Sequence, residues 1–160
     1  MSRTQFDTMN LSPHFTLDEA IVSQTATRLG LDNLPSFETL DVMVVVAGHM
    51  ERVRLLLGGP ILVSSWYRSP EVNAAVGSGP TSQHIKGEAV DFICPAYGDP
   101  FSICQHISRN VDLIHYDQLI FEGSWVHISF CGIPGSIPRK EVLTYMKNRT
   151  YIRGLHESRE

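Results

Sequence analysis

The sequence lacks the features that would place the protein in a membrane or on an export route. None of its apolar runs approaches the roughly 20 residues that a helix needs to cross a bilayer. Residues 1–15, MSRTQFDTMNLSPHF, also lack the apolar core of a secretory signal peptide. We therefore expect no membrane span, and we expect the chain to be made as a soluble cytoplasmic protein.

Positive charge is also scarce. The chain has 13 Lys and Arg against 17 Asp and Glu, which gives a net charge of −4, and its basic residues form no block. Proteins that bind nucleic acid carry a concentrated basic surface that neutralises phosphates. The charge pattern therefore argues against a nucleic-acid partner.

Several sequence motifs of well-known chemistry are missing. The three cysteines, Cys94, Cys104 and Cys131, are odd in number and form no CxxC pair, which predicts buried free thiols and argues against a cysteine zinc knot. The stretch VGSGP lacks the GK[ST] ending of a phosphate-binding loop, and no GxSxG motif indicates a serine hydrolase. Any chemistry must therefore come from other residues.

The composition is that of one globular domain, with 42% hydrophobic and 19% charged residues. Two helices are predicted first, from Thr16 to Gly30 and from Ser36 to Gly59, because each begins at a capping hydroxyl and ends at glycine. The second helix is predicted to have one broad face, which is formed by Leu40, Val44, Ala47, Met50, Arg54 and Leu55.

After Pro60 the pattern alternates between short strands and short helices. Strands are predicted at 61–68, 88–94, 116–122 and 124–130, with helices at 69–77 and 99–110. This order indicates an α+β fold, in which a small, mostly antiparallel sheet packs on the N-terminal helices. We expect an N-terminal arm at 1–15, the domain at 16–138, and a polar, partly helical tail at 139–160.

Two of the predicted strands carry ligand-type side chains on their polar faces. In EAVDFIC, Val90 and Phe92 share one face and Asp91 points the other way, since side chains alternate along a strand. In SWVHISF, His127 likewise points away from the apolar residues of its strand. If the two strands are neighbours, Asp91 and His127 converge on one side of the sheet.

His84 supplies a third candidate ligand from the loop before Asp91. A continuous strand would put His84 on the wrong face, but Gly87 permits a sharp turn that returns it. Each of these residues alone is most often a satisfied polar side chain. Together, two histidines, one carboxylate and an open position form the usual catalytic zinc site, where zinc lowers the pKa of bound water to about 7.

A metal-dependent hydrolase also needs a general base near the attacking water. Glu122 is the nearest carboxylate to His127, across a turn at Gly123, although an exposed turn residue is the alternative interpretation. Glu88 should point to the opposite face, and Asp117 lies further back. Glu122 is therefore the predicted catalytic base.

Two further polar residues are predicted to bind substrate. Arg68 ends the strand-like run SSWYR and offers a planar fork for a carboxylate or phosphate, unless it is an ordinary surface arginine. Ser82, two residues before His84, can donate to a substrate or cap its own loop.

The segment SQHIKGEAVD, residues 82–91, resembles the SxHxxGxAxD signature of the zinc D-Ala-D-Ala carboxypeptidase family, which includes VanY-like and phage-type cell-wall peptidases. SWVHISF resembles the closing strand of that family, and SSWYRSPEVN resembles its upstream segment with a substrate-anchoring arginine. The resemblance spans roughly residues 14–131 and implies a hedgehog-like D,D-peptidase fold.

The resemblance implies zinc ligation by His84, Asp91 and His127. It also implies that Arg68 binds the terminal carboxylate of the peptide or another acidic group of the substrate, and that Ser82 lies close to the substrate. Many members place an acidic residue three positions before the final histidine, where this chain has Ser124. Glu122 lies five positions before that histidine, so the catalytic base is where the sequence departs from the family pattern.

The expected function is therefore that of a Zn2+-dependent peptidase that hydrolyses peptidoglycan stem peptides, as a D-Ala-D-Ala carboxypeptidase. Two alternatives stay open. One is an endopeptidase of the phage-lysin kind that cuts at L-Ala-D-Glu or in a cross-bridge, and the other is a zinc-binding virion or structural domain without turnover. Because no export signal is visible, we expect action on the cell wall after lysis or as part of a phage particle.

Overall fold

The computed structural model describes residues 9–160, so residues 1–8 of the predicted N-terminal arm lie outside the described part. The remainder of the arm contributes to a two-stranded antiparallel sheet of β1 (Asn10–Ser12) and β2 (Phe15–Thr16). Phe15 is buried against Trp66, with the two ring centroids 6.1 Å apart. This small sheet therefore belongs to the core of the domain.

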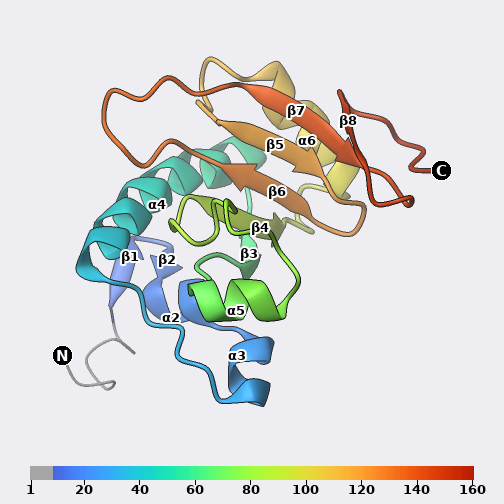
Figure 1. The fold of residues 1–160 in the computed structure, drawn as a ribbon. Helices are drawn as coiled ribbons and strands as arrows, with labels where there is room; N and C mark the ends of the chain where they lie inside the picture. Colours follow the sequence, from blue (N-terminus) through green and yellow to red (C-terminus); the bar gives the residue numbers. More distant parts are fainter. Residues whose placement is uncertain (1–8) are drawn as a thin grey trace.

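A six-stranded sheet forms the centre of the domain (Figure 1). In spatial order it consists of β3 (Leu62–Ser65), β4 (Ala89–Ile93), β6 (Val126–Ser129), β5 (Gln118–Phe121), β7 (Glu141–Tyr145) and β8 (Tyr151–Arg153). Every neighbouring pair is antiparallel except β5 and β7, which run parallel. The predicted α+β fold with a mostly antiparallel sheet is therefore confirmed, with one parallel pair in addition.

The helices in the described residues are α2 (Leu17–Ile21), α3 (Gln24–Leu29), α4 (Phe37–Leu57), α5 (Pro70–Ala75) and α6 (Pro100–Arg109). Four of them begin at the predicted capping residues, and α3 begins at the cap Ser23, which was not predicted. The side chains of Thr16, Ser36, Ser69 and Asp99 each accept a hydrogen bond from the backbone N–H three residues later. These bonds satisfy N–H groups that have no partner inside the first turn of a helix.

Two expectations for the helices are wrong. The single helix predicted over 16–30 is split, because the chain turns extended at Val22 and Ser23 then caps α3. The predicted face of α4 includes Val44 and Leu55, whose side chains are 41% and 82% exposed. The buried stripe consists instead of Leu40, Met43, Val46, Ala47, Met50, Val53 and Leu57. Because α4 is apolar on several sides, its sequence does not define which side is buried.

Helix α6 packs against β5 and β6 on one face of the six-stranded sheet, and α4 packs against α6 and β1 in the same core (Figure 1). Phe101 of α6 meets Phe121 of β5 edge to face, with ring centroids 5.3 Å apart. His49 of α4 stacks on Phe130, just after β6, with centroids 4.7 Å apart. Since side chains alternate along a strand, the polar residues of the central strands point to the opposite face.

Residues 139–160, predicted as a partly helical tail, form strands instead. β7 pairs in parallel with β5, and β8 adds an antiparallel edge. Thr144 is buried, whereas the other residues of β7 are half-buried. A half-buried strand with charged residues gives a weak hydrophobic signal, which explains the wrong prediction. The sheet therefore extends two strands beyond residue 138, where the domain was expected to end.

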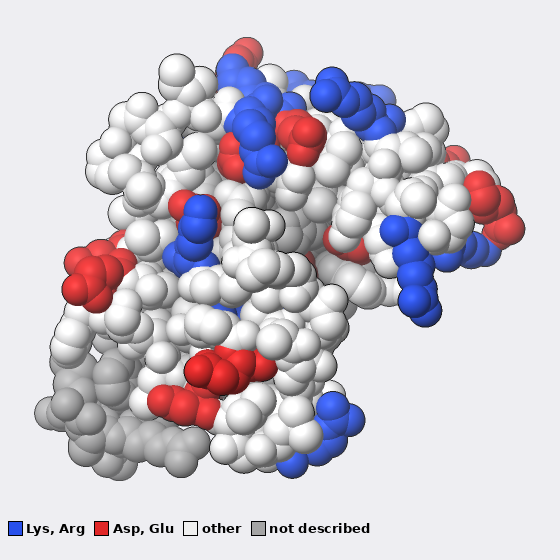
Figure 2. Space-filling view, viewed as in Figure 1, with Lys and Arg blue, Asp and Glu red and all other residues white. Residues whose placement is uncertain are grey.

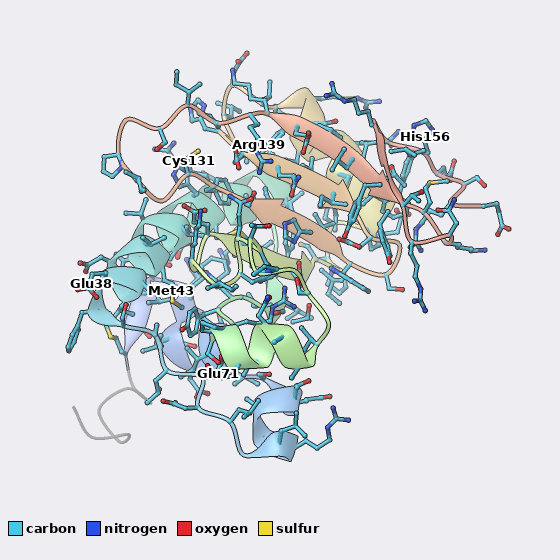
Figure 3. The ribbon with its side chains drawn as sticks, in the orientation of Figure 1. Glu38, Met43, Glu71, Cys131, Arg139 and His156 are labelled. Carbon is cyan, nitrogen blue, oxygen red and sulfur yellow. The ribbon has the colours of Figure 1, made fainter. Side chains whose placement is uncertain are left out.

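The three cysteines are free, as predicted: Cys94 and Cys104 are buried, and Cys131 is half-buried on the loop between β6 and β7 (Figure 3). No helix within residues 9–160 is long and apolar enough to cross a membrane. On the face seen in Figure 2, acidic and basic side chains of the described residues are interspersed. Charge of one sign therefore does not dominate this face.

Candidate metal centre

Asp91 and His127 lie directly opposite each other on the neighbouring antiparallel strands β4 and β6. Val90, Phe92 and Val126 are fully buried on the helix-covered face, so both polar side chains point to the other face. His127 Nδ1 lies 2.9 Å from Asp91 Oδ1. The predicted convergence of these two side chains is therefore confirmed.

His84 reaches the same place from the loop before β4. Gly87 turns this loop with a φ of 73°, in the left-handed region that favours glycine. The Gly87 carbonyl accepts a hydrogen bond from Trp66 Nε1 at 2.8 Å, and Arg68 N donates to His84 O at 3.1 Å. The predicted turn at Gly87 is present, and these bonds fix the loop to the segment that follows β3.

The ligand-type atoms of His84, Asp91 and His127 all lie within 4.8 Å of one another. His84 Nε2 is 3.3 Å from Asp91 Oδ2, and the His84 side chain is almost fully buried. A tetrahedral zinc ion with bonds of about 2.0–2.2 Å holds its ligand atoms about 3.4 Å from one another. Small side-chain movements therefore allow the three residues to share one ion.

The second ring nitrogen of His84 is held by the main chain. His84 Nδ1 lies 2.6 Å from the carbonyl oxygen of Trp66. A carbonyl oxygen only accepts hydrogen bonds, so Nδ1 carries the hydrogen and Nε2 presents a lone pair to the centre. Histidines that ligate metals are commonly oriented by such a contact.

Burial and mutual contact set the charges of the centre. Burial lowers the pKa of His84, against the opposing effect of Asp91, and this favours the neutral ring that binds metal. Burial alone would raise the pKa of Asp91, but its contacts with His84 and His127 outweigh burial and hold that pKa well below its usual range. The centre therefore offers two imidazoles and one carboxylate anion.

Glu122 follows β5 and lines the same cleft as the three candidate ligands. Its backbone N–H donates to Trp125 O at 3.1 Å and closes a turn at Gly123, where φ is 91°. Burial raises the pKa of Glu122 to about 7, with His127 opposing the rise and Asp91 adding to it. A carboxyl group with such a pKa is suited to accept a proton near neutral pH.

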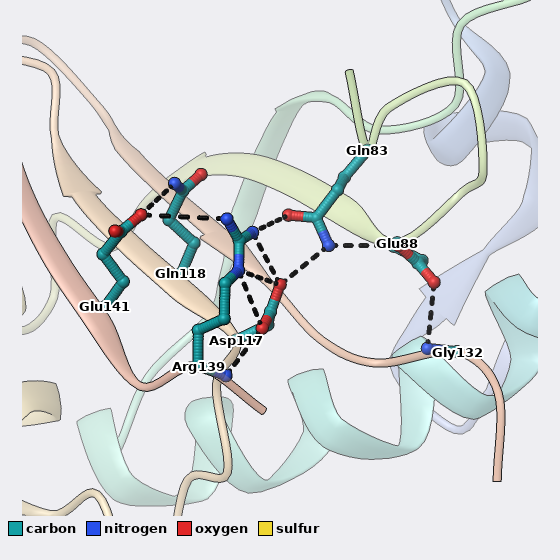
Figure 4. A network of polar contacts seen from close by, with 7 residues as sticks. All are labelled: Gln83, Glu88, Asp117, Gln118, Gly132, Arg139 and Glu141. Carbon is teal, nitrogen blue, oxygen red and sulfur yellow. Dashed lines mark hydrogen bonds and ion pairs between the residues drawn. The ribbon is translucent and has the colours of Figure 1, made fainter. Parts of the chain in front are cut away.

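The neighbouring carboxylates Asp117 and Glu88 make structural contacts (Figure 4). Asp117 accepts hydrogen bonds from the backbone N, Nε and Nη2 of Arg139, the shortest at 2.7 Å. Glu88 accepts from Gln83 Nε2 at 3.0 Å and from Gly132 N at 3.2 Å. Because Gln83 also bonds to Asp117 and Arg139, one network joins the loop before β4 to the segment before β7.

Arg68 and Ser82 lie together beside the centre. Arg68 Nη2 donates to Ser82 Oγ at 3.5 Å, and the same oxygen accepts from His84 N at 3.3 Å. Arg68 Nε is buried and has no hydrogen-bond partner among the described residues. Burial lowers the pKa of Arg68, and Asp91 opposes this effect. A half-buried guanidinium with a free donor is suited to bind an anion such as a carboxylate.

All the predicted site residues line one cleft of about 650 Å³, namely Arg68, Ser82, His84, Asp91, Glu122 and His127. The sequence interpretation missed other residues of its walls, among them Gln118, Ile120, Trp125, Arg139, Leu143, Tyr145 and Tyr151. Four of these lie in the segment that was predicted as a tail. The half-polar sequence from Glu141 to Tyr145 gives only a weak strand signal, so these residues of the cleft could not be found from the sequence.

The cleft groups two histidines, a carboxylate and a second carboxyl group, which are the side chains that a metal-dependent hydrolase needs. The chain belongs to the Peptidase M15 family, whose family model matches residues 13–129. Members of this family are zinc-dependent peptidases. A search of curated proteins finds no match. The family match agrees with the expected span of 14–131, and it ends before β7 and β8.

Proposed function

We propose that the protein is a zinc-dependent peptidase that hydrolyses peptidoglycan stem peptides as a D-Ala-D-Ala carboxypeptidase. The observation that carries the proposal is the grouping of His84, Asp91 and His127, with ligand-type atoms within 4.8 Å of one another, in the cleft that Arg68 also lines. Membership of the Peptidase M15 family supports the same class of reaction. In this proposal the three grouped residues hold the ion.

The donor set fits zinc. Imidazole nitrogen and carboxylate oxygen are common zinc ligands, and three protein ligands with one open position form the catalytic arrangement. The Trp66 carbonyl orients His84, and the contacts of Asp91 keep its carboxylate ionised. When bound, zinc polarises the peptide carbonyl and lowers the pKa of bound water to about 7.

Glu122 is the proposed general base. Its carboxylate takes a proton from the water that attacks the carbonyl carbon of the scissile amide. The protonated Glu122 then donates this proton to the amide nitrogen as the C–N bond breaks, which releases a free amine and leaves a new carboxylic acid. The proton of this acid then passes to the amine, so the products are a carboxylate and an ammonium group. A pKa near 7 lets one group accept and then return the proton.

Arg68 indicates which bond of the peptide is cleaved. Its guanidinium offers a buried, unpaired Nε and an Nη2 beside the loop of His84, and a planar guanidinium binds a carboxylate through two parallel hydrogen bonds. A peptide held at Arg68 by its terminal carboxylate would place its last amide bond at the centre. This favours removal of a terminal residue over internal cleavage at L-Ala-D-Glu or in a cross-bridge.

The test is release of D-alanine from a stem pentapeptide by the zinc-loaded protein. We expect release by the wild type and by His115→Ala, which removes an exposed histidine outside the cleft, and none by His84→Ala. If the wild type neither releases D-alanine nor cleaves cross-linked wall, the peptidase proposal is wrong. Mass spectrometry of digested wall identifies the bond, and fragments cut internally would indicate the endopeptidase.

A zinc-binding structural domain without turnover makes a different prediction for Glu122. It would bind about one zinc ion per chain, yet the wild type and Glu122→Ala would show the same activity. The raised pKa and burial of Glu122 beside the centre favour turnover, because a strongly perturbed carboxyl group in a cleft is typical of catalytic sites. The place of action, on the wall after lysis or in a phage particle, stays a prediction.

A further inference from the structure

The cleft continues from the metal centre across the sheet. Strand register places Asp91 opposite His127, His127 opposite Ile120, and Ile120 opposite Leu143. Ile120 and Leu143 both line the cleft. Because neighbouring strands are about 4.8 Å apart, this aliphatic floor extends to about 10 Å from His127.

A wall of aromatic side chains borders this floor. Tyr145 lies two residues beyond Leu143 on β7, so both side chains are on the same face of the sheet. Tyr151 of β8 is directly opposite Tyr145, and their ring centroids are 4.8 Å apart. The wall consists of these two tyrosines, which line the cleft together with Trp125 and Glu122. The floor and the wall thus form a continuous surface beside the proposed base.

The wall is a fixed part of the sheet. Arg159 Nε donates to the carbonyl oxygen of Tyr145 at 2.6 Å, and its guanidinium lies over the ring of Phe121, 5.9 Å from the centroid. Thr144 Oγ1 donates to Gly154 O at 2.8 Å and ties β7 to the residue after β8. A surface that is held in this way is preformed, so a ligand does not have to order it.

The wall and the outer part of the floor come from residues beyond the family match, which ends at residue 129. Arg68 lies in the opposite direction, because it follows β3, on the side of β4 away from β6. The candidate metal centre therefore separates Arg68 from the aliphatic and aromatic surface. A peptide that contacts both Arg68 and this surface must cross the strands over the candidate metal centre.

We propose that Ile120, Leu143, Tyr145 and Tyr151 form an acyl-side subsite, which binds the part of the peptide that precedes the scissile bond. This rests on the proposed function, which places the terminal carboxylate at Arg68. An extended peptide advances about 3.3–3.6 Å per residue, so the floor holds about three residues before the bond. The preferred substrate is a peptide of about four or more residues with an alkyl side chain over the floor, and a free dipeptide is a poor substrate.

A longer peptide is expected to react faster because contacts remote from the reacting bond can accelerate the reaction. Apolar surface that a long peptide buries on Ile120 and Leu143 is unavailable to a dipeptide, which ends at the centre. Truncated substrates that lose such contacts lose rate as well as affinity. The length preference of this chain therefore depends on β7 and β8.

The experiment compares kcat/KM of the zinc-loaded full chain for a stem pentapeptide and for the dipeptide D-Ala-D-Ala. Tyr151→Ala removes a half-exposed ring of the wall, whereas Tyr97→Ala removes a ring of similar exposure that stacks on His106 outside the cleft. We expect Tyr151→Ala to lower kcat/KM for the pentapeptide about fivefold to tenfold and to leave the dipeptide unchanged. Tyr97→Ala should change neither.

A binding measurement separates this inference from the proposed reaction. Calorimetry on zinc-loaded Glu122→Gln, with and without Tyr151→Ala, gives the affinity for the pentapeptide without turnover. Weaker binding in the double variant supports the subsite even if the wild type hydrolyses nothing. If the wild type hydrolyses the pentapeptide and Tyr151→Ala matches Tyr97→Ala on both substrates, the subsite is wrong and the function stands. A wild type that neither binds nor cleaves the pentapeptide overturns both.

Discussion

His84 Nδ1 donates its hydrogen to the main-chain carbonyl oxygen of Trp66, 2.6 Å away, and this contact aims His84 Nε2 at Asp91. The carbonyl belongs to the residue that follows β3, two residues before Arg68. One short segment therefore orients a candidate metal ligand and presents the proposed carboxylate-binding arginine. The geometry of the ion and the position of the substrate are linked through this segment.

Metal binding should stabilise the fold through these ligands. We expect zinc at 100 times its dissociation constant to raise the free energy of unfolding of the wild type by about 2.7 kcal/mol, because the unfolded chain does not hold the three ligands together. His84→Ala and Asp91→Ala should lose this gain, and His115→Ala should keep it. Urea unfolding with zinc and with chelator gives the values. Equal zinc stabilisation in all four proteins would contradict the assignment of the ligands.

Glu122→Gln should separate metal binding from turnover. The amide keeps the size of the side chain but accepts no proton, so we expect kcat to fall by about 10²–10⁴-fold. Zinc content should stay at the wild-type level, since Glu122 is outside the group of candidate ligands. Asp112→Asn, which neutralises an exposed carboxylate, serves as the matched control in the same assay of D-alanine release. Loss of zinc together with activity would make Glu122 a ligand instead of a base.

The raised pKa of Glu122 predicts how the stability of the metal-free protein changes with pH. The ordinary pKa of a glutamate is 4.5, and burial raises that of folded Glu122 to about 7. The folded state therefore holds this proton more tightly than the unfolded state. Its contribution to stability is fully present below pH 4.5 and is lost as the pH rises through about 7.

The check is urea unfolding in chelator at pH 5 and pH 8, for the wild type and Glu122→Gln. The free energy of unfolding of the wild type should fall between the two pH values relative to that of the variant, because glutamine does not titrate. The opposite sign, or an unchanged difference, would show that the carboxyl group is not desolvated in the folded protein.

Local signals in the sequence predicted much of the fold. Thr16, Ser36 and Asp99 cap helices because a short side-chain oxygen satisfies free N–H groups within a few residues. Alternation along a strand predicted that Asp91 and His127 point away from the core. These rules depend on neighbours in the chain, so they hold before any tertiary contact is known.

Contacts between distant residues could not be predicted in the same way. The Trp66 carbonyl that orients His84 comes from a residue 18 positions away, and neither residue type predicts this hydrogen bond. Burial raises the pKa of Glu122 only once the strands of the sheet have assembled. β7 is stabilised by parallel pairing with β5, which follows from the topology and not from its own half-polar sequence.

The polar network around Asp117 should stabilise the attachment of the C-terminal strands. Arg139 makes three donor contacts to this buried carboxylate, but its own side chain is 53% exposed, so we expect Arg139→Ala to lower the free energy of unfolding by about 1 kcal/mol. Arg52→Ala, on an exposed position of α4, should have a smaller effect.

The effect of Arg139→Ala should also depend on pH. Burial would raise the pKa of Asp117, but the hydrogen bonds and charge of Arg139 outweigh burial and lower it. The stabilisation is therefore present above the ordinary aspartate value of 3.8 and is lost as the pH falls through the lowered pKa. Unfolding measured at pH 7 and pH 3 should show the wild type and the variant converging at the acidic end. A gap that stays constant would show that the ion pair contributes no stability.

Gly87 should be essential for placing His84. Its φ of 73° is strained for any other residue, and an added Cβ would lie 2.6 Å from Cγ of the buried Met43 on α4 (Figure 3). Gly77 has a φ of 77° but nothing within 4 Å of an added Cβ, so Gly77→Ala measures the backbone strain alone, about 1–2 kcal/mol. We expect Gly87→Ala to destabilise the fold by more than Gly77→Ala and also to weaken zinc binding about 10–100-fold, as loss of an orienting contact does. Equal destabilisation and equal zinc affinity in the two variants would show that the position of His84 does not depend on this turn.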